Sequence, residues 1–510
     1  MTILSPMFLF LFVPILLTMF HVIGRKWGET GALIVIILGS FAFAQTQGGW
    51  FLALFSASLL FNMLIIQKLI DGDRKAGAKL LLFAVCVNLL SLVVFKYSGL
   101  LSRVPQLGME FRKLETLIPI TISFLTFQRL TALVDAPTNR AELLGWRGAL
   151  RFTAFAGFFP NLLIGPIAYL QEILPQFRRN DFGSVRAINL AVGLTLVAIG
   201  LFKKAFIADQ IGAAFVNPVW ASLVDHRQIT SVDALLAIIG YFVQLYFDFS
   251  GYSDVAIGVG RMFGIILPTN FFSPFRAVGI VDFYRRWHIG LTRVISRFLF
   301  TPLSIMGTRL AARRGWRGLR RPAVSLWVPL IINFFIIGIW HDAKVTYVLY
   351  GLLHGIWYSI ESQARGSKWW KSYRKRRSDL FRAVTGRMIT LPVLMVTFSL
   401  FRAPSVGYYQ QLIASLVPGR SSEASVIATS LPMLALLTGA YLIVFFLPNS
   451  HEFLGRYRPG ILTYKVPSYT PTAFARHWRP TLGWGLLMIV LLGVGFYTLP
   501  QAAPFSYGVF

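Results

Sequence analysis

The residue best placed for proton transfer is His341, one of seven histidines in the chain. It stands in Trp340-His341-Asp342, at the turn between two apolar runs. Titratable groups at membrane depth are costly to bury and are usually functional. An imidazole titrates near neutral pH, which suits a general base that activates a hydroxyl for attack on an acyl carbonyl. An interfacial histidine at a helix end is an equally open interpretation of its position.

A second candidate, His288, closes the charged and aromatic segment Asp282-Phe283-Tyr284-Arg285-Arg286-Trp287-His288. Arg285 and Arg286 could each bind a phosphate or a carboxylate through two hydrogen bonds. From the residues alone we favour the other interpretation, a belt of aromatic and arginine side chains at the membrane interface. His354 lies in the apolar run after His341, and we expect it to pack against a helix and to bond to a backbone carbonyl.

Two carboxylates, Asp248 and Asp254, lie in the apolar segment YFDFSGYSD. Carboxylates inside a membrane need partners, and pairing with an arginine such as Arg276 is the default expectation. A proton path and the lining of an active site are the alternatives. No two histidines have the i, i+4 spacing of a zinc-binding helix, so we expect no metal site. The lone Cys86 excludes an internal disulfide and a thiolate metal cluster.

The elements that must position these residues are apolar helices. Hydrophobic residues make up 55% of the 510 positions and charged residues 14%, whereas soluble domains carry about 25% charged residues. Apolar runs of about 20 residues are long enough to cross the membrane, and they must be helical because lipid offers their amides no partner. The composition predicts an all-α polytopic membrane protein, one domain over 1–510 with about 11–14 hydrophobic segments. The candidate spans are 3–23, 29–45, 50–70, 78–95, 117–134, 152–170, 187–207, 231–248, 251–266, 322–340, 344–360, 387–403, 428–447 and 480–499.

Two regions of the chain, the candidate span 152–170 and the stretch 268–303 between two spans, are expected to be irregular. The run 152–170 holds Pro160 and Pro166, which predict a kinked or re-entrant helix. The stretch 268–303 is too rich in arginine to face lipid, so we expect it at the interface or inside the protein. The glycines of 258–264 lack the spacing of a dinucleotide-binding loop, and we interpret them as helix-packing residues.

The net charge of +29 does not indicate nucleic-acid binding, because the basic residues stand in short loops between apolar runs. That distribution is typical of cytoplasmic loops in membrane proteins. The loops 309–321 and 365–377 are therefore predicted to be cytoplasmic, and the turn 340–344 lies on the other side. The sequence does not decide on which side of the membrane the loop 96–116 lies. The number of preceding spans predicts the outside, but Lys96 and three further basic residues argue against it. We expect 3–23 to be a retained first helix and not a cleaved signal.

At these residues the sequence resembles the membrane-bound O-acyltransferase superfamily, and within it the bacterial alginate O-acetylases and teichoic-acid D-alanyl transfer proteins. Nine blocks match in family order: LIPITISFLTFQ, FFPNLLIGPI, GLFKKAFIAD, YFDFSGYSDVAIGVGRMFG, NFFSPFRA, DFYRRWHIGL, IGIWHDAKVTYVLYGLLHG, LFRAPS and LPNS. The resemblance implies a multi-helix bundle in which His341 is catalytic and His288 is the second family histidine. We name as substrate-binding candidates Trp340, Asp342, Trp287, Arg285, Arg286, Asp248 and Asp254.

Three departures from the family pattern suggest a branch that acts on a polymer other than alginate, such as cellulose. Asp342 replaces the motif glycine, Gly290 replaces the usual serine, and the chain ends in FSYGVF where the family is richer in aromatics. A carboxylate beside the base could orient the imidazole or raise its pKa.

The resemblance implies an O-acetyltransferase of the bacterial cell inner membrane. It would take acetyl from a cytoplasmic donor, acetyl-CoA or an acyl carrier, with no tightly bound cofactor, and deliver it for O-acetylation of an exported polysaccharide. Expected partners are a periplasmic acyltransferase and a polysaccharide synthase or export complex. The alternative functions are a transporter or flippase for an acylated or phosphorylated lipid, and a structural subunit of a synthase.

Overall fold

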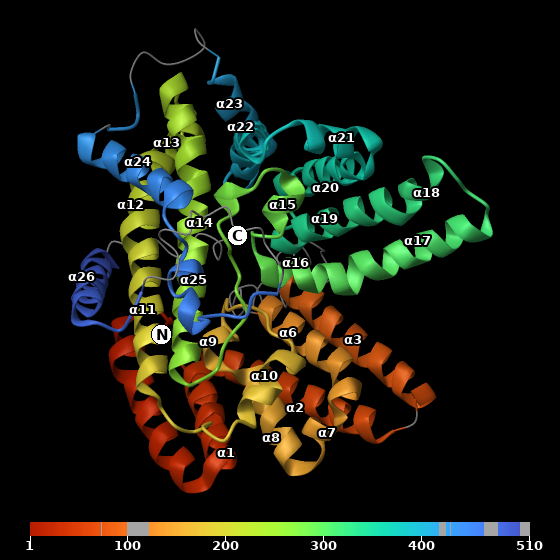
Figure 1. Cartoon of the computed structure of the whole chain (residues 1–510), viewed down its shortest axis with the longest axis vertical. Helices are drawn as coiled ribbons and strands as arrows, with labels where there is room; N and C mark the ends of the chain where they lie inside the picture. Colours follow the sequence, from red (N-terminus) through yellow and green to blue (C-terminus); the bar gives the residue numbers. More distant parts are fainter. Residues whose placement is uncertain (73, 99–121, 418–424, 429, 464–477, 500–510) are drawn as a thin grey trace.

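The regular structure of the chain is helical, as predicted (Figure 1). The computed structural model describes residues 1–510 except 73, 99–121, 418–424, 429, 464–477 and 500–510. Among the described residues no strand is formed, and a single isolated bridge joins Pro268 to Ile461. The basic residues Arg103, Arg112 and Lys113 and the terminal FSYGVF fall outside the described residues.

Within the described part of the chain, eight helical stretches are long and apolar enough to cross a membrane. They are Phe8–Gln45, Gly49–Asp71, Ala76–Lys96, Ala187–Val224, Ser231–Met262, Ile289–Arg313, Arg320–His341 and Asp379–Phe401. Two shorter apolar helices follow, α24 (Leu431–Phe446) and α26 (Leu482–Thr498). The polytopic architecture is therefore confirmed.

The first of these stretches contains α1 (Val13–Gln45), which is a hairpin of two arms that reverses at Gly28. Gly28 has a φ of 60°, a left-handed value that favours glycine. Gly39 of the second arm lies so close to Leu16 of the first arm that a Cβ atom would meet the leucine at 2.6 Å. This reversal separates the predicted spans 3–23 and 29–45 where the sequence placed the break.

The centre of the molecule is a pair of long, tightly packed helices (Figure 1). The chain from α11 (Ala187–Leu201) through α12 (Asp209–Ile211) to α13 (Asn217–Val224) is one continuous stretch with two π-helical turns, and it packs against α14 (Ser231–Met262). A Cβ atom on Gly251 would lie 2.6 Å from the Gly200 carbonyl, and one on Gly258 would lie 2.6 Å from the Gly193 carbonyl. Small residues thus let the two backbones touch, which confirms helix packing for Gly258.

The prediction of two separate spans at 231–248 and 251–266 was wrong. Gly251 does not interrupt α14, because it serves the contact with Gly200 and keeps helical geometry. The helix ends instead at Met262, where Gly264 adopts a φ of 76°.

The two regions expected to be irregular differ in outcome. In 152–170 the helix α8 (Gly145–Gly157) breaks at Phe158, a single turn α9 (Phe159–Leu162) follows, and no regular structure forms from there to Tyr169, so the helix is interrupted as the prolines predicted. In 268–303 the chain is mostly buried and irregular up to His288, with a 3-10 turn at Pro274–Arg276 and the short helix α15 (Ile280–Tyr284). From Ile289, α16 (Ile289–Ile295) and α17 (Thr301–Arg313) belong to one of the eight stretches whose length and composition fit a membrane span. The expectation that this half avoids lipid stays a prediction. Its Arg293 and Arg297 are neutralised by Glu172 at 2.5 Å and Asp135 at 2.6 Å.

A helical hairpin carries the turn at His341. The helix α18 (Arg320–Pro322) continues into α19 (Val328–His341), and α20 (Val345–Gly366) returns beside it. A Cβ atom on Gly338 would lie 2.3 Å from the Tyr347 carbonyl, and one on Gly351 would lie 2.4 Å from the Phe334 carbonyl, so the arms are in direct contact. The predicted span 344–360 forms α20, which is not among the eight apolar stretches.

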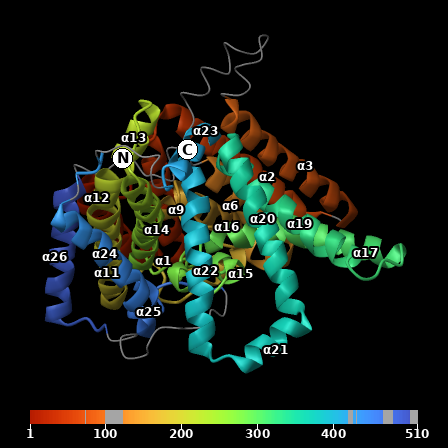
Figure 2. The same cartoon turned by 90° about the horizontal axis from the view of Figure 1, so that it is seen from above.

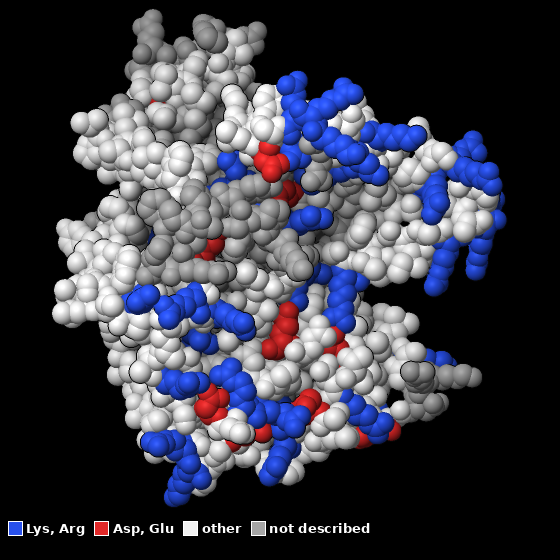
Figure 3. Space-filling view, in the orientation of Figure 1, with Lys and Arg blue, Asp and Glu red and all other residues white. Residues whose placement is uncertain are grey.

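Basic side chains gather over the helices next to this hairpin (Figure 3). Both views show α17 projecting from the edge of the molecule (Figures 1 and 2), and α21 (Lys368–Arg376) follows α20. The exposed arginines of α17 and of the turn that leads into α18 are Arg309, Arg313, Arg314, Arg317, Arg320 and Arg321. The other described helices are α2 (Gly49–Asp71), α3 (Arg74–Lys96), α6 (Ile122–Asp135), α7 (Arg140–Leu143), α10 (Leu170–Phe177), α22 (Asp379–Phe398), α23 (Val406–Ala414) and α25 (Ser450–Phe453).

Candidate active site

His341 is the last residue of α19 and is buried among aromatic rings. The helix ends there because Asp342 is extended, with φ −160° and ψ 156°. The centre of the imidazole ring lies 4.6 Å from that of Trp340, 4.8 Å from that of Phe401 and 6.1 Å from that of Tyr347. The Tyr347 hydroxyl donates a hydrogen bond to the Phe401 carbonyl at 3.0 Å, which ties two of these rings together. The His341 ring is therefore held by packing against three aromatic side chains.

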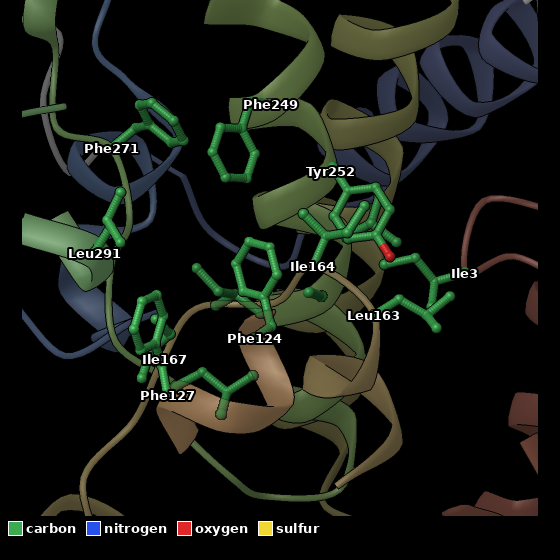
Figure 4. Close-up of a cluster of buried hydrophobic side chains, with 14 of the residues drawn as sticks. Ile3, Phe124, Phe127, Leu163, Ile164, Ile167, Phe249, Tyr252, Phe271 and Leu291 are labelled. Atoms are coloured by element: carbon green, nitrogen blue, oxygen red, sulfur yellow. The ribbon is translucent and has the colours of Figure 1, made fainter. Parts of the chain in front are cut away.

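His288 lies on a different element, in the backbone position that precedes α16. Its φ of 45° and ψ of 53° are left-handed, a conformation that costs energy in a side chain of this size and is characteristic of functional sites. Three phenylalanines surround its ring, at centroid distances of 4.7 Å for Phe249 and 6.4 Å for Phe124 and Phe271. They belong to the buried apolar cluster drawn in Figure 4. Burial among them lowers the pKa of His288 to about 3, so the imidazole is neutral at physiological pH.

Asn270 fixes which nitrogen of His288 carries the proton. Its Oδ1 accepts a hydrogen bond from the Gly290 amide at 3.2 Å, and a backbone amide can only donate. The same Oδ1 lies 3.1 Å from Nδ1 of His288, so Nδ1 is the donor there. The Asn270 amide group in turn donates to Ser253 at 3.2 Å. This chain of bonds leaves Nε2 of His288 as the basic nitrogen.

Trp340 joins the two histidines into one site. Its ring lies 4.6 Å from the His341 ring and 6.4 Å from the His288 ring, between centroids. Phe124 and Phe127 of α6 pack on its other edges at 6.2 Å and 5.7 Å. The structure therefore brings together three predicted site residues from two segments that are about fifty positions apart in the sequence. We call His288, Trp340 and His341 the two-histidine site.

The rim of this site is formed by charged residues of the turn and of α3. Asp342 is partly exposed and forms an ion pair with Lys344 at 2.9 Å. Lys96, the last residue of α3, places its ammonium group 4.9 Å from the centre of the Trp340 ring. The adjacent Tyr97 donates a hydrogen bond to the Ile339 carbonyl at 2.7 Å. The end of α3 and the turn 340–344 thus lie together.

Trp287 and Arg286 lie in the protein interior. Trp287 is stacked between Phe242 and Phe283, with centroid distances of 6.3 Å and 5.3 Å. Arg286 is 1% exposed and forms an ion pair with Asp282 at 3.0 Å. Arg285, by contrast, is exposed. Of this segment, only Arg285 is open to an anionic ligand arriving from solvent.

Asp248 and Asp254 belong to a buried ion-pair network, which we call the lysine–aspartate cluster. Lys204 binds both Asp248 at 2.9 Å and Asp209 at 2.6 Å, and Lys203 binds Asp254 at 2.6 Å. Pairing was expected, but the proposed partner was wrong. The two lysines come from a π-helical turn (202–208) after α11 that packs against α14, whereas Arg276 lies 3.7 Å from Glu452.

His354 is the centre of a separate hydrogen-bonded chain. Its Nε2 lies 2.7 Å from the Thr397 hydroxyl and its Nδ1 2.6 Å from the Tyr284 hydroxyl, which also contacts Tyr350 at 2.6 Å. Thr397 gives its proton to the Val393 carbonyl, so Nε2 is the donor and Nδ1 the acceptor. The expectation of a packing histidine holds, but its partners are side-chain hydroxyls and not a backbone carbonyl.

Sequence reasoning missed Asn270 as a site residue and left Lys96 as an unassigned loop charge. Asn270 stands in the block NFFSPFRA, where a buried amide between apolar residues was the available signal. Lys96 could not be assigned because the contact between α3 and the turn after α19 spans more than 240 positions. Among the described residues, no group of three His, Cys, Asp or Glu side chains is placed to hold a metal ion.

Comparison with known proteins gives one family. The model of the membrane-bound O-acyltransferase family matches residues 65–399, a range that includes both histidines of the site. The peptidoglycan O-acetyltransferase of Helicobacter pylori is 32% identical, over 70% of this chain and 69% of its own length. The probable alginate O-acetylase AlgI of Azotobacter vinelandii is 30% identical, over 81% of this chain and 77% of its own. The teichoic acid D-alanyltransferase of Bacillus subtilis is 28% identical, over 74% and 91% respectively.

Proposed function

The chain belongs to the membrane-bound O-acyltransferase family, and from this premise we propose that it moves acetyl groups from a cytoplasmic thioester towards an exported polysaccharide. The observation that carries the proposal is the meeting of His341 and His288 around Trp340 in a site lined by aromatic rings. A neutral imidazole in such surroundings can accept a proton from a hydroxyl, and exclusion of water protects the acyl group from hydrolysis.

In the proposed reaction His341 is the general base. It removes the proton from an acceptor hydroxyl while that oxygen forms a bond to the acyl carbonyl carbon. The tetrahedral intermediate then breaks its carbon–sulfur bond, and the thiolate that leaves takes the proton from the imidazolium. His288, with Nδ1 bound to Asn270, offers Nε2 to the same space as an acceptor that orients the reacting hydroxyl.

Acetyl-CoA is the proposed donor, and the exposed arginines of 309–321, at the opposite end of the α18–α19 arm from His341, support entry of the donor from that side. An anionic donor is attracted to a surface on which arginines gather (Figure 3). The acceptor is proposed to be a polysaccharide such as alginate or cellulose, because relatives carry the names of peptidoglycan, alginate and teichoic acid enzymes. A periplasmic acyltransferase and a synthase or export complex are the proposed partners, and the bacterial inner membrane is the proposed location.

Two measurements test the function together. Cells with and without the protein should differ in the acetyl content of their secreted polysaccharide, and the purified protein should release free CoA from acetyl-CoA when an acceptor is supplied. A difference in acetyl content without any turnover of acetyl-CoA would favour a transporter of an already acylated lipid. Equal acetyl content in both strains would refute the assignment to polysaccharide acetylation.

A further inference from the structure

Lys96 is a partly buried cation at the edge of the two-histidine site. It ends α3, and its ammonium group lies over the Trp340 ring at 4.9 Å. Its charge is close enough to act electrostatically on His341 and on Asp342. The hydrogen bond from Tyr97 to the Ile339 carbonyl at 2.7 Å holds the end of α3 against the end of α19. The packing of α3 against α19 therefore fixes the position of the Lys96 charge relative to His341.

Lys96 forms no ion pair with any residue in the described part of the chain. The nearby carboxylate, Asp342, has its ion pair with Lys344 at 2.9 Å. The other lysines buried near the middle of apolar helices, Lys203 and Lys204, each bind a carboxylate within 3 Å. A lysine that sets membrane orientation needs only to reach water, as exposed Lys68 does at the end of α2. The Lys96 ammonium group instead lies over the ring of Trp340, within the site.

We propose that Lys96 supplies the positive charge that stabilises the oxyanion of the acyl-transfer step. This proposal rests on the function proposed above and adds a residue to it. When the acceptor oxygen bonds to the acyl carbon, the carbonyl oxygen becomes an oxyanion and His341 holds the proton. An ammonium group beside Trp340 faces that negative charge in surroundings of low dielectric constant, where a fixed charge is most effective. The charge returns to the carbonyl bond when the thiolate leaves.

The first test replaces the ammonium group and keeps the side-chain length. Lys96→Met should lower kcat by about 10²–10³, the effect of removing one oxyanion donor, with little change in the KM for acetyl-CoA. A lost cation–π contact with Trp340 alone would account for about a thirtyfold change at most, even if the ammonium group is desolvated. Lys68→Met is the matched control, since it removes a lysine from the last turn of another apolar helix, and it should keep wild-type kcat.

The second test restores the charge chemically. Cys86 is the chain's only cysteine, so Cys86→Ser gives a background in which Lys96→Cys can be modified alone. Aminoethyl methanethiosulfonate should restore kcat by at least tenfold, whereas propyl methanethiosulfonate, which adds the same length without the charge, should not. Equal rescue by both reagents, or a Lys96→Met variant within about thirtyfold of wild type, would overturn the role of Lys96.

His341→Ala separates the two proposals. If that variant is inactive while Lys96→Met is normal, only the oxyanion role fails. If His341→Ala also transfers acetyl at the wild-type rate, the proposed mechanism fails with it. Thermal stability of each variant in detergent, compared with that of Lys68→Met, identifies loss of folding.

Discussion

The lysine–aspartate cluster and the two-histidine site are both buried sets of titratable side chains, but they use burial in opposite ways. In the cluster, Lys203 and Lys204 meet Asp254 and Asp248 at 2.6 Å and 2.9 Å, so each charge has an opposite charge beside it. In the site, His341 and His288 face aromatic rings. In the cluster, the opposite charges lie within hydrogen-bonding distance of one another. In the site, the imidazole rings lie among aromatic side chains, which is the environment that the proposed proton transfer to a neutral base requires.

The comparison shows why burial of a polar residue is a weak guide to function by itself. Asp248 and Asp254 were named as substrate-binding candidates because carboxylates at membrane depth are costly. Their partners remove that cost, and the network joins the π-helical turn 202–208 to α14. The histidines differ from these carboxylates in their surroundings, which are aromatic rings and, for Nδ1 of His288, the side-chain oxygen of Asn270.

The largest expected effect is on the site. A histidine that transfers a proton contributes a factor of about 10²–10⁴ in rate, so His341→Ala should reduce acetyl transfer by that factor. His341→Gln should fail as well, because an amide can form hydrogen bonds but does not accept the proton at neutral pH. The measurement is acetyl transfer per mole of protein present in the membrane.

His354→Ala is the matched control for that loss. His354 is equally buried and hydrogen-bonded, to Tyr284 and Thr397, but it lies in a separate chain of hydroxyls. Its removal should lower the melting temperature or the yield more than the activity per molecule. If His354→Ala folded normally but lost as much activity as His341→Ala, His354 would belong to the active site, and its assignment to a structural hydrogen-bonded chain would be wrong.

The second prediction concerns the cluster and its stability. Lys204→Met removes the cation shared by Asp209 and Asp248 and leaves two buried carboxylates facing each other. Loss of one partner from a buried ion pair typically costs about 3–5 kcal/mol, so the melting temperature in detergent should fall sharply. Adding Asp209→Asn and Asp248→Asn should recover much of the loss, since the uncompensated charge is then gone.

The activity of the same Lys204→Met variant shows whether the lysine–aspartate cluster takes part in the reaction or only stabilises the fold. The folded fraction of the Lys204→Met variant should keep its acetyl transfer per molecule. A well-folded variant with normal melting temperature and no activity would instead place the lysine–aspartate cluster in the reaction, as a proton path.

Patterns local in sequence predicted well, and contacts distant in sequence did not. The apolar runs predicted the helices, and the gap between the spans 3–23 and 29–45 and the proline at 160 indicated breaks that the structure confirms, because these signals act on the backbone where they stand. The motif around His341 predicted a turn at the end of a helix but not the residues that surround the imidazole. Lys96 could not be placed from sequence, since its contact with Trp340 depends on how α3 packs against α19. The break expected near Gly251 was wrong for the same reason, because Gly200 decides the role of that glycine.

The smallest expected effect distinguishes two neighbouring arginines that sequence reasoning treated alike. Arg285 is exposed, so Arg285→Gln should raise the KM for acetyl-CoA severalfold at low salt, with kcat nearly unchanged. The increase should shrink at high ionic strength, because salt already screens the same attraction. Arg286 is 1% exposed and bound to Asp282, so Arg286→Gln should instead destabilise the protein and leave the salt dependence of KM as it is. Initial rates at two salt concentrations, with melting temperatures for both variants, decide the matter. An Arg285→Gln variant with unchanged KM at low salt would remove this arginine from donor recognition and leave the exposed arginines of 309–321 to attract the donor.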